Sequence, residues 1–444
     1  MTIKTSATAN DLGFAGAADN TIERRAGFML AVMIVLAVLS QFYRSSSGVI
    51  APDLAQDLHL SADDLGILSS AFFVVFAVLQ IPLGVLFDRF GPRRVQATMM
   101  LWTVVGSLIF AAAESQTALV VGRLMMGFGC AGIMVGSLVV LSRWYSPGRF
   151  TRAMALLFAS ANAGSLIATL PLASAADTFG WRWTFVGLAG LAGVLIVAFL
   201  AIIRDTPPGS DASVDKRQES LWETIKGLGR VYRNRDLLAV LPLVGVGYAS
   251  VITVLGLWGG PYLHDVHGLT GIERGNVLSA MAIAMILGTL FYGPLDRQFN
   301  TRKWVTIVGG SGTAGLFLLL AAVPDASLAA VTAMLAALSF VGAYSLVAMA
   351  HGLSLFTGDL AGRGTTTLNL ALMGGTAVIQ AVSGAVVSHV AAQDGAAPTS
   401  AYSALFLFLA FLTVAALAVY ASARDVKPKV DNAPATGNLR PQES

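Results

Sequence analysis

Two copies of one basic turn decide the fold of this chain. The first follows an apolar run and reads Gly84-Val-Leu-Phe-Asp88-Arg89-Phe-Gly91-Pro-Arg93-Arg94. A weaker copy reads Gly293-Pro-Leu-Asp296-Arg297-Gln-Phe-Asn-Thr-Arg302-Lys303, and its aspartate lies 208 residues after that of the first. Glycine lets helices approach closely, and an aspartate at a helix end can reach an arginine and a neighbouring helix N-terminus. We therefore predict a conformational latch, repeated in the two halves, formed by Gly84, Asp88, Arg89, Gly91, Arg93, Asp296 and Arg297.

The chain around these turns is strongly apolar. Of its 444 residues, 55% are hydrophobic and only 12% are charged, whereas soluble domains carry about 25% charged residues. This composition excludes a soluble enzyme and a nucleic-acid-binding protein. The single cysteine, Cys130, permits neither an internal disulfide nor a cysteine-based metal site. We expect no catalytic residues, no metal and no cofactor.

Twelve apolar segments of membrane-spanning length follow the polar N-terminus. A long polar break separates six of them from the other six. The predicted fold is therefore an all-α membrane protein with twelve transmembrane helices in two six-helix bundles. The predicted divisions are an N-terminal tail (1–26), a first bundle (27–203), a central loop (204–236), a second bundle (237–422) and a disordered C-terminal tail (423–444).

The positive charges predict the orientation. If the N-terminus is cytoplasmic, 24 of the 28 lysines and arginines fall in cytoplasmic segments. The outside loops then keep only Arg182 and Arg274. Because basic residues concentrate on the cytoplasmic side of membrane proteins, we predict that both termini, the central loop and both repeated turns are cytoplasmic.

The two turns closely resemble the signature loop of the major facilitator superfamily of transporters. The fourth apolar segment contains Gly122-Arg123-Leu-Met-Met-Gly127-Phe-Gly129, similar to the Arg-x-x-x-Gly-x-Gly segment of that family, with Arg123 and Gly127 in the matching positions. The turn Gly180-Trp181-Arg182-Trp-Thr-Phe185 is also similar to the family. The resemblance implies the major facilitator fold, with two bundles around a central cavity and alternating access to that cavity.

Within that family the chain looks most like the anion:cation symporter branch, whose members take up sugar acids and other organic anions. The similarity rests on Tyr43-Arg44, Ala51-Pro52, Ser69-Ser70-Ala71-Phe72 and Gln80-Ile81-Pro82. Two positions depart from the branch. Tyr43 replaces its aspartate beside the arginine, and Cys130 lies near a position where it often has a glutamate. The Gly-Pro-rich fifth helix of drug exporters is absent, which disfavours efflux.

Two arginines lie within predicted spans, where a charge costs about 2.5–3.5 kcal/mol on insertion scales and is usually functional. Arg44 lies in the outer half of the first span, and Arg123 lies inside the fourth. A guanidinium suits bidentate binding of a carboxylate or phosphate, so we predict that Arg44 binds substrate. The alternative is that Arg44 reaches the outer surface or caps a carbonyl. For Arg123 a structural role is favoured, as in the family.

Uncharged polar side chains within the spans are the other candidates for substrate binding. Each could instead hydrogen-bond a neighbouring helix. With Arg44, the predicted set is Tyr43, Gln80, Asn162, Tyr344, Asn369 and Gln380.

A coupling proton would need a titratable group in the cavity, but no acidic residue lies in the middle of a span. Either helix packing brings a terminal residue into the cavity, or transport is not proton-coupled. The first reading selects Glu114, which could turn toward Arg123, ahead of His351 near the inner end of the tenth span.

The sequence therefore predicts a multi-pass secondary transporter of a bacterial inner membrane, and no enzyme. Its expected partners are a small-molecule substrate, the lipid bilayer and a coupling proton, without nucleic acid, and it is expected to be monomeric. The leading function is uptake of an organic anion by symport. Two alternatives stay open, import of a vitamin-like nutrient such as riboflavin and efflux of a toxic small molecule. A receptor is disfavoured because the loop and tails are too short for a signalling domain.

Overall fold

The computed structural model describes residues 9–207, 234–356, 361–393 and 398–428, and every regular element within these ranges is helical. The first bundle contains α1 (Ala9–Ser45), α2 (Ser47–Leu58), α3 (Ala62–Phe90), α4 (Pro92–Ala111), α5 (Gln116–Ala131), α6 (Ile133–Trp144), α7 (Pro147–Ile167) and α8 (Leu170–Ile202). The second contains α10 (Arg235–Thr253), η1 (Val254–Trp258), α11 (Gly259–Asp265), α12 (Gly271–Tyr292), α13 (Leu295–Gln298), α14 (Lys303–Ala322), α15 (Leu328–Gly342), α16 (Ser345–Ser354), α17 (Ala361–Ala391) and α18 (Pro398–Tyr420).

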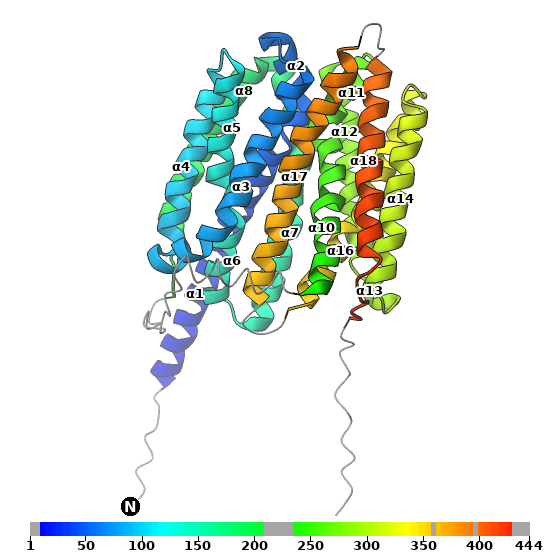
Figure 1. The fold of residues 1–444 in the computed structure, drawn as a ribbon. Helices are drawn as coiled ribbons and strands as arrows, with labels where there is room; N and C mark the ends of the chain where they lie inside the picture. Colours follow the sequence, from blue (N-terminus) through cyan, green and yellow to red (C-terminus); the bar gives the residue numbers. More distant parts are fainter. Residues whose placement is uncertain (1–8, 208–233, 357–360, 394–397, 429–444) are drawn as a thin grey trace, which may run out of the picture.

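Twelve helical segments of the described chain are long and apolar enough to cross a membrane. This confirms the predicted number of spans and the all-α fold. Figure 1 shows the described ends of α1 and α18 at the same end of the molecule. We call this end the termini face and the other end the opposite face. That the termini face is cytoplasmic stays a prediction from the distribution of basic residues.

Two predicted boundaries need adjustment. Helix α1 begins at Ala9, so much of the predicted tail 1–26 is helical. The predicted disordered tail begins with residues that pack on the second bundle, since Ala423 is buried and Asp425 hydrogen-bonds to Thr301. Residues 208–233 of the predicted central loop and residues 429–444 of the tail lie outside the described part of the chain.

Polar residues at the starts of several spans explain where the helices begin. Ser61 and Asp64 form a reciprocal capping box at α3, and Thr270 and Glu273 form another at α12. Ser115 caps α5 by accepting a hydrogen bond from the Ala118 N–H. Such caps satisfy N–H groups that have no partner within the helix. These polar residues therefore determine at which residue a helix begins, which the length of an apolar run does not define.

At least five of the twelve spans are interrupted. The breaks in the first, fourth, seventh and tenth spans fall at Ser46, at Gly132, at the π-helical turn 254–258 and at 343–344, and the eighth span is broken at 293–294. Because π-turns and broken membrane helices are frequent at functional sites, these breaks mark candidate parts of a functional site.

The two bundles meet mainly through small residues in the half nearest the opposite face. Gly66 of α3 and Gly384 of α17 approach so closely that a Cβ built on Gly66 would lie 2.8 Å from the Gly384 Cα. Gly48 of α2 faces the Gly256 and Leu257 backbone in the same way. Thr169 of the first bundle hydrogen-bonds to Ser279 of α12. Among the described residues, these contacts hold the bundles together at the opposite face.

Candidate substrate site and latch

Arg44 lies just before the break in the first span, with its guanidinium over an aromatic ring. The Arg44 Cζ atom is 4.8 Å from the centroid of the Phe76 ring of α3, close enough for a cation–π interaction. The buried Nε atom of Arg44 has no hydrogen-bond partner. The described residues supply no carboxylate to this arginine. Its Nε–H group is therefore left for an acceptor that the described residues do not provide.

Arg123 of α5 is fully buried beside the same region. Its Nη1 atom donates to the Tyr43 carbonyl over 2.8 Å, and its Cζ atom lies 5.0 Å from the centroid of the Phe72 ring. The Nε and Nη2 atoms have no partner. Arg123 thus combines the structural role that the sequence favoured with two donors that are still free.

The break in the first span explains the contact between Tyr43 and Arg123. At Ser46 the helix is interrupted, and the Ser46 hydroxyl itself turns back to donate to the Tyr43 carbonyl over 3.1 Å. A carbonyl released from the helical pattern is a good acceptor for a buried guanidinium. The break also brings the first span against the π-turn of the seventh, since Gly256 packs beside Ser45.

Cys130 lies in the same electrostatic neighbourhood, within range of both guanidinium groups. It is 1% exposed, and its Sγ atom is 3.9 Å from Thr103 Oγ1. A thiol there is neutral at ordinary pH, so it does not balance the two positive charges. In the described spans, acidic side chains occur only near helix ends. The candidate site therefore has two cations and no internal anion.

Arg274, the other fully buried arginine among the described residues, has a carboxylate partner. Arg274 of α12 is 2% exposed, and its Nη2 atom lies 3.4 Å from Asp53 Oδ1 of α2. This ion pair joins the two bundles near the opposite face. Burial raises the pKa of Asp53 above its ordinary value, against the opposing effect of the nearby Arg274 charge. Among the described arginines inside the spans, Arg44, which is partly buried, and Arg123, which is fully buried, therefore lack the carboxylate that Arg274 has.

The structure places the predicted uncharged site residues in three settings. Tyr43 and Tyr344 are fully buried inside separate bundles, and the Tyr43 hydroxyl pairs with Ser107 over 2.8 Å. The prediction that Tyr43 contacts substrate does not fit this geometry, whereas the Tyr344 hydroxyl has no partner and its role stays a prediction. Gln80, Asn162 and Asn369 are partly buried, so their role stays a prediction. Gln380 is 1% exposed and its Oε1 atom has no partner, which keeps it a candidate in the second bundle.

Sequence reasoning missed two aromatic residues and two hydroxyl groups. Phe72 and Phe76 stack with 5.9 Å between ring centroids and support the two guanidinium groups. Their spacing of four residues on one helix was the available signal. Ser250 and Thr253 lie just before the π-turn, and their buried hydroxyl oxygens have no partner. Serine and threonine are too common in membrane helices to be selected from sequence alone.

The predicted proton-coupling residues lie away from the arginines. Glu114 is exposed between α4 and α5, whereas the described neighbours of Arg123 are Tyr43 and Phe72. The expectation that Glu114 turns toward Arg123 is therefore wrong, because the helix end keeps this carboxylate in solvent. His351 of α16 is fully buried, but it is occupied in a different network at the termini face.

At the termini face, each half of the chain holds its basic turn with a carboxylate that follows its last span. In the first half, Asp205 Oδ1 accepts a hydrogen bond from the Arg93 backbone N–H over 2.8 Å. Arg93 Nη2 donates in turn to the Leu200 carbonyl over 2.5 Å. We call Arg93, Leu200 and Asp205 the first clasp. The predicted latch residue Asp88 is exposed on the same turn.

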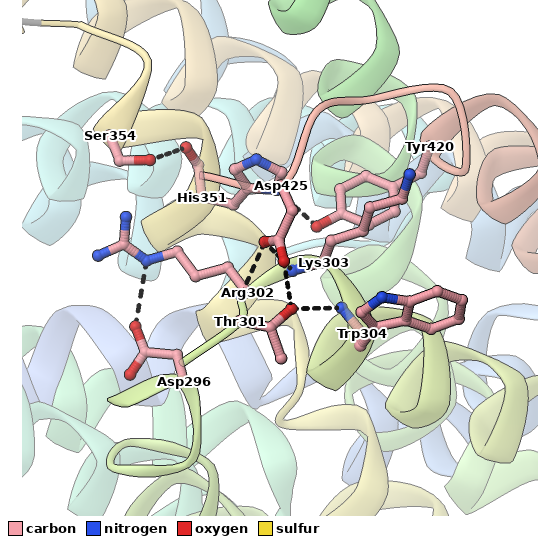
Figure 2. A network of polar contacts seen from close by, with 9 residues as sticks. All are labelled: Asp296, Thr301, Arg302, Lys303, Trp304, His351, Ser354, Tyr420 and Asp425. Atoms are coloured by element: carbon pink, nitrogen blue, oxygen red, sulfur yellow. Dashed lines mark hydrogen bonds and ion pairs between the residues drawn. The ribbon is translucent and has the colours of Figure 1, made fainter. Parts of the chain in front are cut away.

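The second half repeats the arrangement with Asp425, as Figure 2 shows. Asp425 accepts hydrogen bonds from the Thr301 hydroxyl at 2.6 Å and from the Arg302 and Lys303 backbone N–H groups at 3.2 and 3.1 Å. Lys303 Nζ donates to the Ala421 carbonyl over 2.7 Å, the counterpart of the Arg93–Leu200 bond. We call Thr301, Arg302, Lys303, Ala421 and Asp425 the second clasp.

Electrostatics at the second clasp favours an ionised Asp425. Burial opposes ionisation, but the hydrogen bonds from Thr301, Lys303 and Arg302 outweigh it, so the pKa of Asp425 lies below its ordinary value. The predicted latch residue Asp296 is buried and pairs with Arg302, with 3.1 Å between Oδ2 and Nε. The expected contact between this aspartate and an arginine is present, although its partner is Arg302 and the predicted Arg297 is exposed.

His351 joins the second clasp to the tenth span (Figure 2). Its Nε2 atom lies 2.9 Å from the Arg424 carbonyl, and its Nδ1 atom lies 2.6 Å from the Tyr420 hydroxyl. Because a carbonyl only accepts hydrogen bonds, Nε2 carries the proton. In the neutral ring Nδ1 then accepts from Tyr420. Both ring nitrogens of His351 thus have a hydrogen-bond partner, which indicates a structural role. Its contact with Arg424 joins residues that are 73 positions apart in the chain.

Two glycines and a tryptophan of the sequence motifs have clear packing roles. A Cβ built on Gly127 would lie 2.6 Å from the Phe72 carbonyl, so this glycine lets α5 pack on α3 beside Arg123. Gly180 has a φ of 79°, which an L side chain rarely adopts, and turns the chain into the sixth span. Trp181 and Arg182 then donate to Asp57 over 2.8 and 2.6 Å. These bonds hold the pKa of Asp57 below its ordinary value.

The comparisons with known proteins agree with this architecture. The family model of the Major Facilitator Superfamily matches residues 33–275. A putative tartrate transporter of Agrobacterium vitis is 26% identical over 67% of this chain and 70% of its own length. A probable L-galactonate transporter of Escherichia coli (strain K12) is 24% identical over 67% of this chain and 68% of its own length.

Solved structures show the same fold. A bacterial homologue of the human lysosomal transporter Spinster, in an inward-facing and occupied conformation, has a TM-score of 0.73 at 18% identity, covering 89% of this chain and 96% of that one. The nucleoside transporter NupG has a TM-score of 0.72 at 14% identity, covering 90% and 98%.

Repeated bundles, twelve spans and a buried charged site define a multi-pass membrane carrier of small molecules. The chain belongs to the Major Facilitator Superfamily of transporters. The family predicted from the two basic turns is confirmed. Its function is transport rather than catalysis, and its partners are a small-molecule substrate and the lipid bilayer.

Proposed function

We propose that this protein takes up a small organic anion across a bacterial inner membrane by alternating access, with the termini face in the cytoplasm. One observation carries the proposal, the pair of arginines within the first bundle, Arg44 and Arg123, which have buried unsatisfied nitrogens and no carboxylate partner among the described residues. Arg44 and Arg123 have three N–H-bearing nitrogens that are buried and unsatisfied. Unpaired buried charge is costly, and a carboxylate or phosphate of the solute would compensate it while accepting directed hydrogen bonds.

The neighbouring side chains support a solute of modest size that carries hydroxyl groups as well as the anion. Ser250, Thr253 and Gln380 of the second bundle each have a buried polar atom without a partner. The hydroxyl groups of a hydroxylated acid could hydrogen-bond to these atoms. Tartrate and L-galactonate, after which the two relatives above are named, are hydroxylated acids. Binding between the bundles would let the solute favour their closure around it.

Transport by purified protein in liposomes tests the proposal. The panel contains labelled hydroxy-dicarboxylates, sugar acids, inorganic phosphate and, for the alternative of a neutral nutrient, riboflavin. We expect uptake of an organic acid and none of riboflavin. Export from vesicles of the opposite orientation, with no import, would instead favour efflux.

A conservative substitution then ties the activity to the site. In Arg44→Lys a point charge replaces the planar pair of donors, so the KM for the transported anion should rise about tenfold or more. The matched control is Arg182→Lys, which alters an exposed arginine at the opposite face. Unchanged affinity in Arg44→Lys would remove Arg44 from the binding site.

The same purified protein can be used to determine the coupling ion and the oligomeric state. The sequence favoured a coupling proton and a monomer. A proton gradient imposed across the liposomes, with and without a protonophore, measures the first, and the size of the protein in detergent measures the second. Uptake that ignores the gradient would leave the anion-transport proposal intact and remove the proton.

A further inference from the structure

The charge of the candidate site has a consequence for the return of the empty carrier. Arg44 and Arg123 both lie in the first bundle, and their guanidinium groups lie over the rings of Phe76 and Phe72, which stack on each other. A guanidinium stays protonated in proteins, so the site itself keeps its positive charge through the whole cycle. Neither arginine is paired with a carboxylate of the described chain, whereas the buried Arg274 is paired with Asp53.

Alternating access requires the bundles to close over the site twice in each cycle, once loaded and once empty. In the loaded closure the substrate anion compensates the arginines. In the empty closure two cations must be enclosed in low dielectric without a partner, which is strongly unfavourable. A carrier with a titratable carboxylate beside its arginines could compensate the empty site from within. Acidic residues of the described spans lie near helix ends, and His351 is held by Tyr420 and Arg424 at the termini face.

We propose that this protein catalyses anion exchange: it moves one organic anion in while it moves another out, and net uptake is limited by the return of the empty two-arginine site. The inference rests on the proposed function, since it needs an anionic substrate. It assigns a further activity, in which an internal anion acts as the counter-substrate. No covalent step is involved, and exchange of anions of equal charge moves no net charge.

Counterflow in liposomes measures this activity directly. The probes are labelled tartrate and labelled galactonate, each offered to liposomes that contain either the same unlabelled anion or only buffer. We expect the initial uptake rate of the transported probe to be at least tenfold higher into preloaded liposomes. A pH gradient, acid outside, should not raise uptake into buffer-filled liposomes to the preloaded rate.

Cys130 offers a gain-of-function test because it lies near both arginines. In Cys130→Asp a carboxylate joins the site and should compensate part of its charge when empty. We expect net uptake into buffer-filled liposomes to rise, so that the ratio of exchange to net uptake falls toward one. Cys130→Ser is the matched control and should keep the ratio of the unaltered protein. If Cys130→Asp does not fold, the ratio in the unaltered protein still decides the proposal.

The outcomes separate the two claims. Equal rates into preloaded and buffer-filled liposomes would overturn exchange and leave anion transport standing. Uptake of neither probe under either condition would overturn the proposed anion transport and exchange with it. A high ratio in the unaltered protein that falls in Cys130→Asp and persists in Cys130→Ser supports exchange through charge compensation.

Discussion

The two bundles share a scaffold and differ in their interiors. Both have a carboxylate after the last span, Asp205 or Asp425, which accepts hydrogen bonds at the start of a helix, and a basic side chain that binds a carbonyl of the last span. Among the described residues, the first bundle carries two arginines, Arg44 and Arg123, with buried nitrogens that lack a partner and with no carboxylate beside them, whereas Arg274 of the second bundle is paired with Asp53. The second offers buried uncharged polar atoms without a partner, such as Gln380 Oε1.

This difference distinguishes the two clasps, which occur in both bundles, from the arginine site, which occurs in the first. The clasps are present in both bundles, and each connects a basic turn to the end of the last span of its bundle. In the function that we propose, one pair of arginines binds the anion, and the other bundle completes the site with weaker hydrogen bonds. A solute that binds between the two bundles can therefore favour the conformation in which they are closed around it.

The largest expected effect lies in the first bundle. Arg44→Ala should lower kcat/KM for the transported anion about a hundredfold, because a charge-assisted pair of hydrogen bonds worth about 3 kcal/mol is lost. The matched change in the second bundle, Gln380→Ala, should lower it less than tenfold. Liposome uptake of the labelled anion measures both. Equal losses would show that the bundles share the binding energy.

Substitutions of the two latch aspartates predicted from the sequence should affect transport and stability differently. Asp88→Asn should reduce turnover about tenfold with normal membrane insertion, because an altered basic turn shifts the balance between conformations. Asp296→Asn should reduce turnover less, as its copy of the motif is less complete. Wild-type turnover in Asp88→Asn would remove its role in the latch.

For stability, the structure predicts the opposite order, with a larger loss in Asp296→Asn than in Asp88→Asn. Asp296 is buried and paired with Arg302 at 3.1 Å, whereas Asp88 is exposed. Asp296→Asn should therefore cost about 1–2 kcal/mol of stability, since it weakens a partly buried ion pair, and Asp88→Asn should cost less. Thermal unfolding in detergent measures both. A larger loss in Asp88→Asn would contradict this assignment.

The sequence predicted the number of spans, the family, the two basic turns and the two intramembrane arginines. These features follow from local patterns, because apolar length, motif order and a charge within a span need no tertiary information. It could not predict Asp205 and Asp425 as clasp residues, since each acts on a helix more than 100 positions earlier in the chain. Glu114 failed for the same reason, because the direction of a helix end depends on packing.

The clasps give a smaller effect that also depends on pH. Asp425 accepts from three donors and Asp205 from the Arg93 backbone N–H, so Asp425→Ala should destabilise more, by about 2 kcal/mol against about 1 kcal/mol for Asp205→Ala. Because the pKa of Asp425 is lowered in the folded protein, its contribution is complete above the ordinary carboxyl pKa. It is lost as the pH falls through the lowered value.

Thermal unfolding of the unaltered protein and of Asp425→Ala between about pH 3 and pH 7 checks this sign. The difference in stability between them should be constant near neutral pH and shrink on acidification. A difference that grows on acidification would mean that the carboxyl is bound in its neutral form.

The smallest effect concerns the bond between Tyr420 and His351. Tyr420→Phe removes one hydroxyl and leaves His351 Nδ1 without its 2.6 Å partner, which should cost about 1 kcal/mol of stability. If His351 is structural, as its two hydrogen bonds indicate, the pH profile of liposome uptake should not move in this variant. Ser422→Ala, an exposed change close to Tyr420 in the chain, serves as the control. A shifted pH profile in Tyr420→Phe with an unchanged one in Ser422→Ala would return His351 to the coupling role that the sequence had allowed, and would place part of the transport chemistry in the second bundle after all.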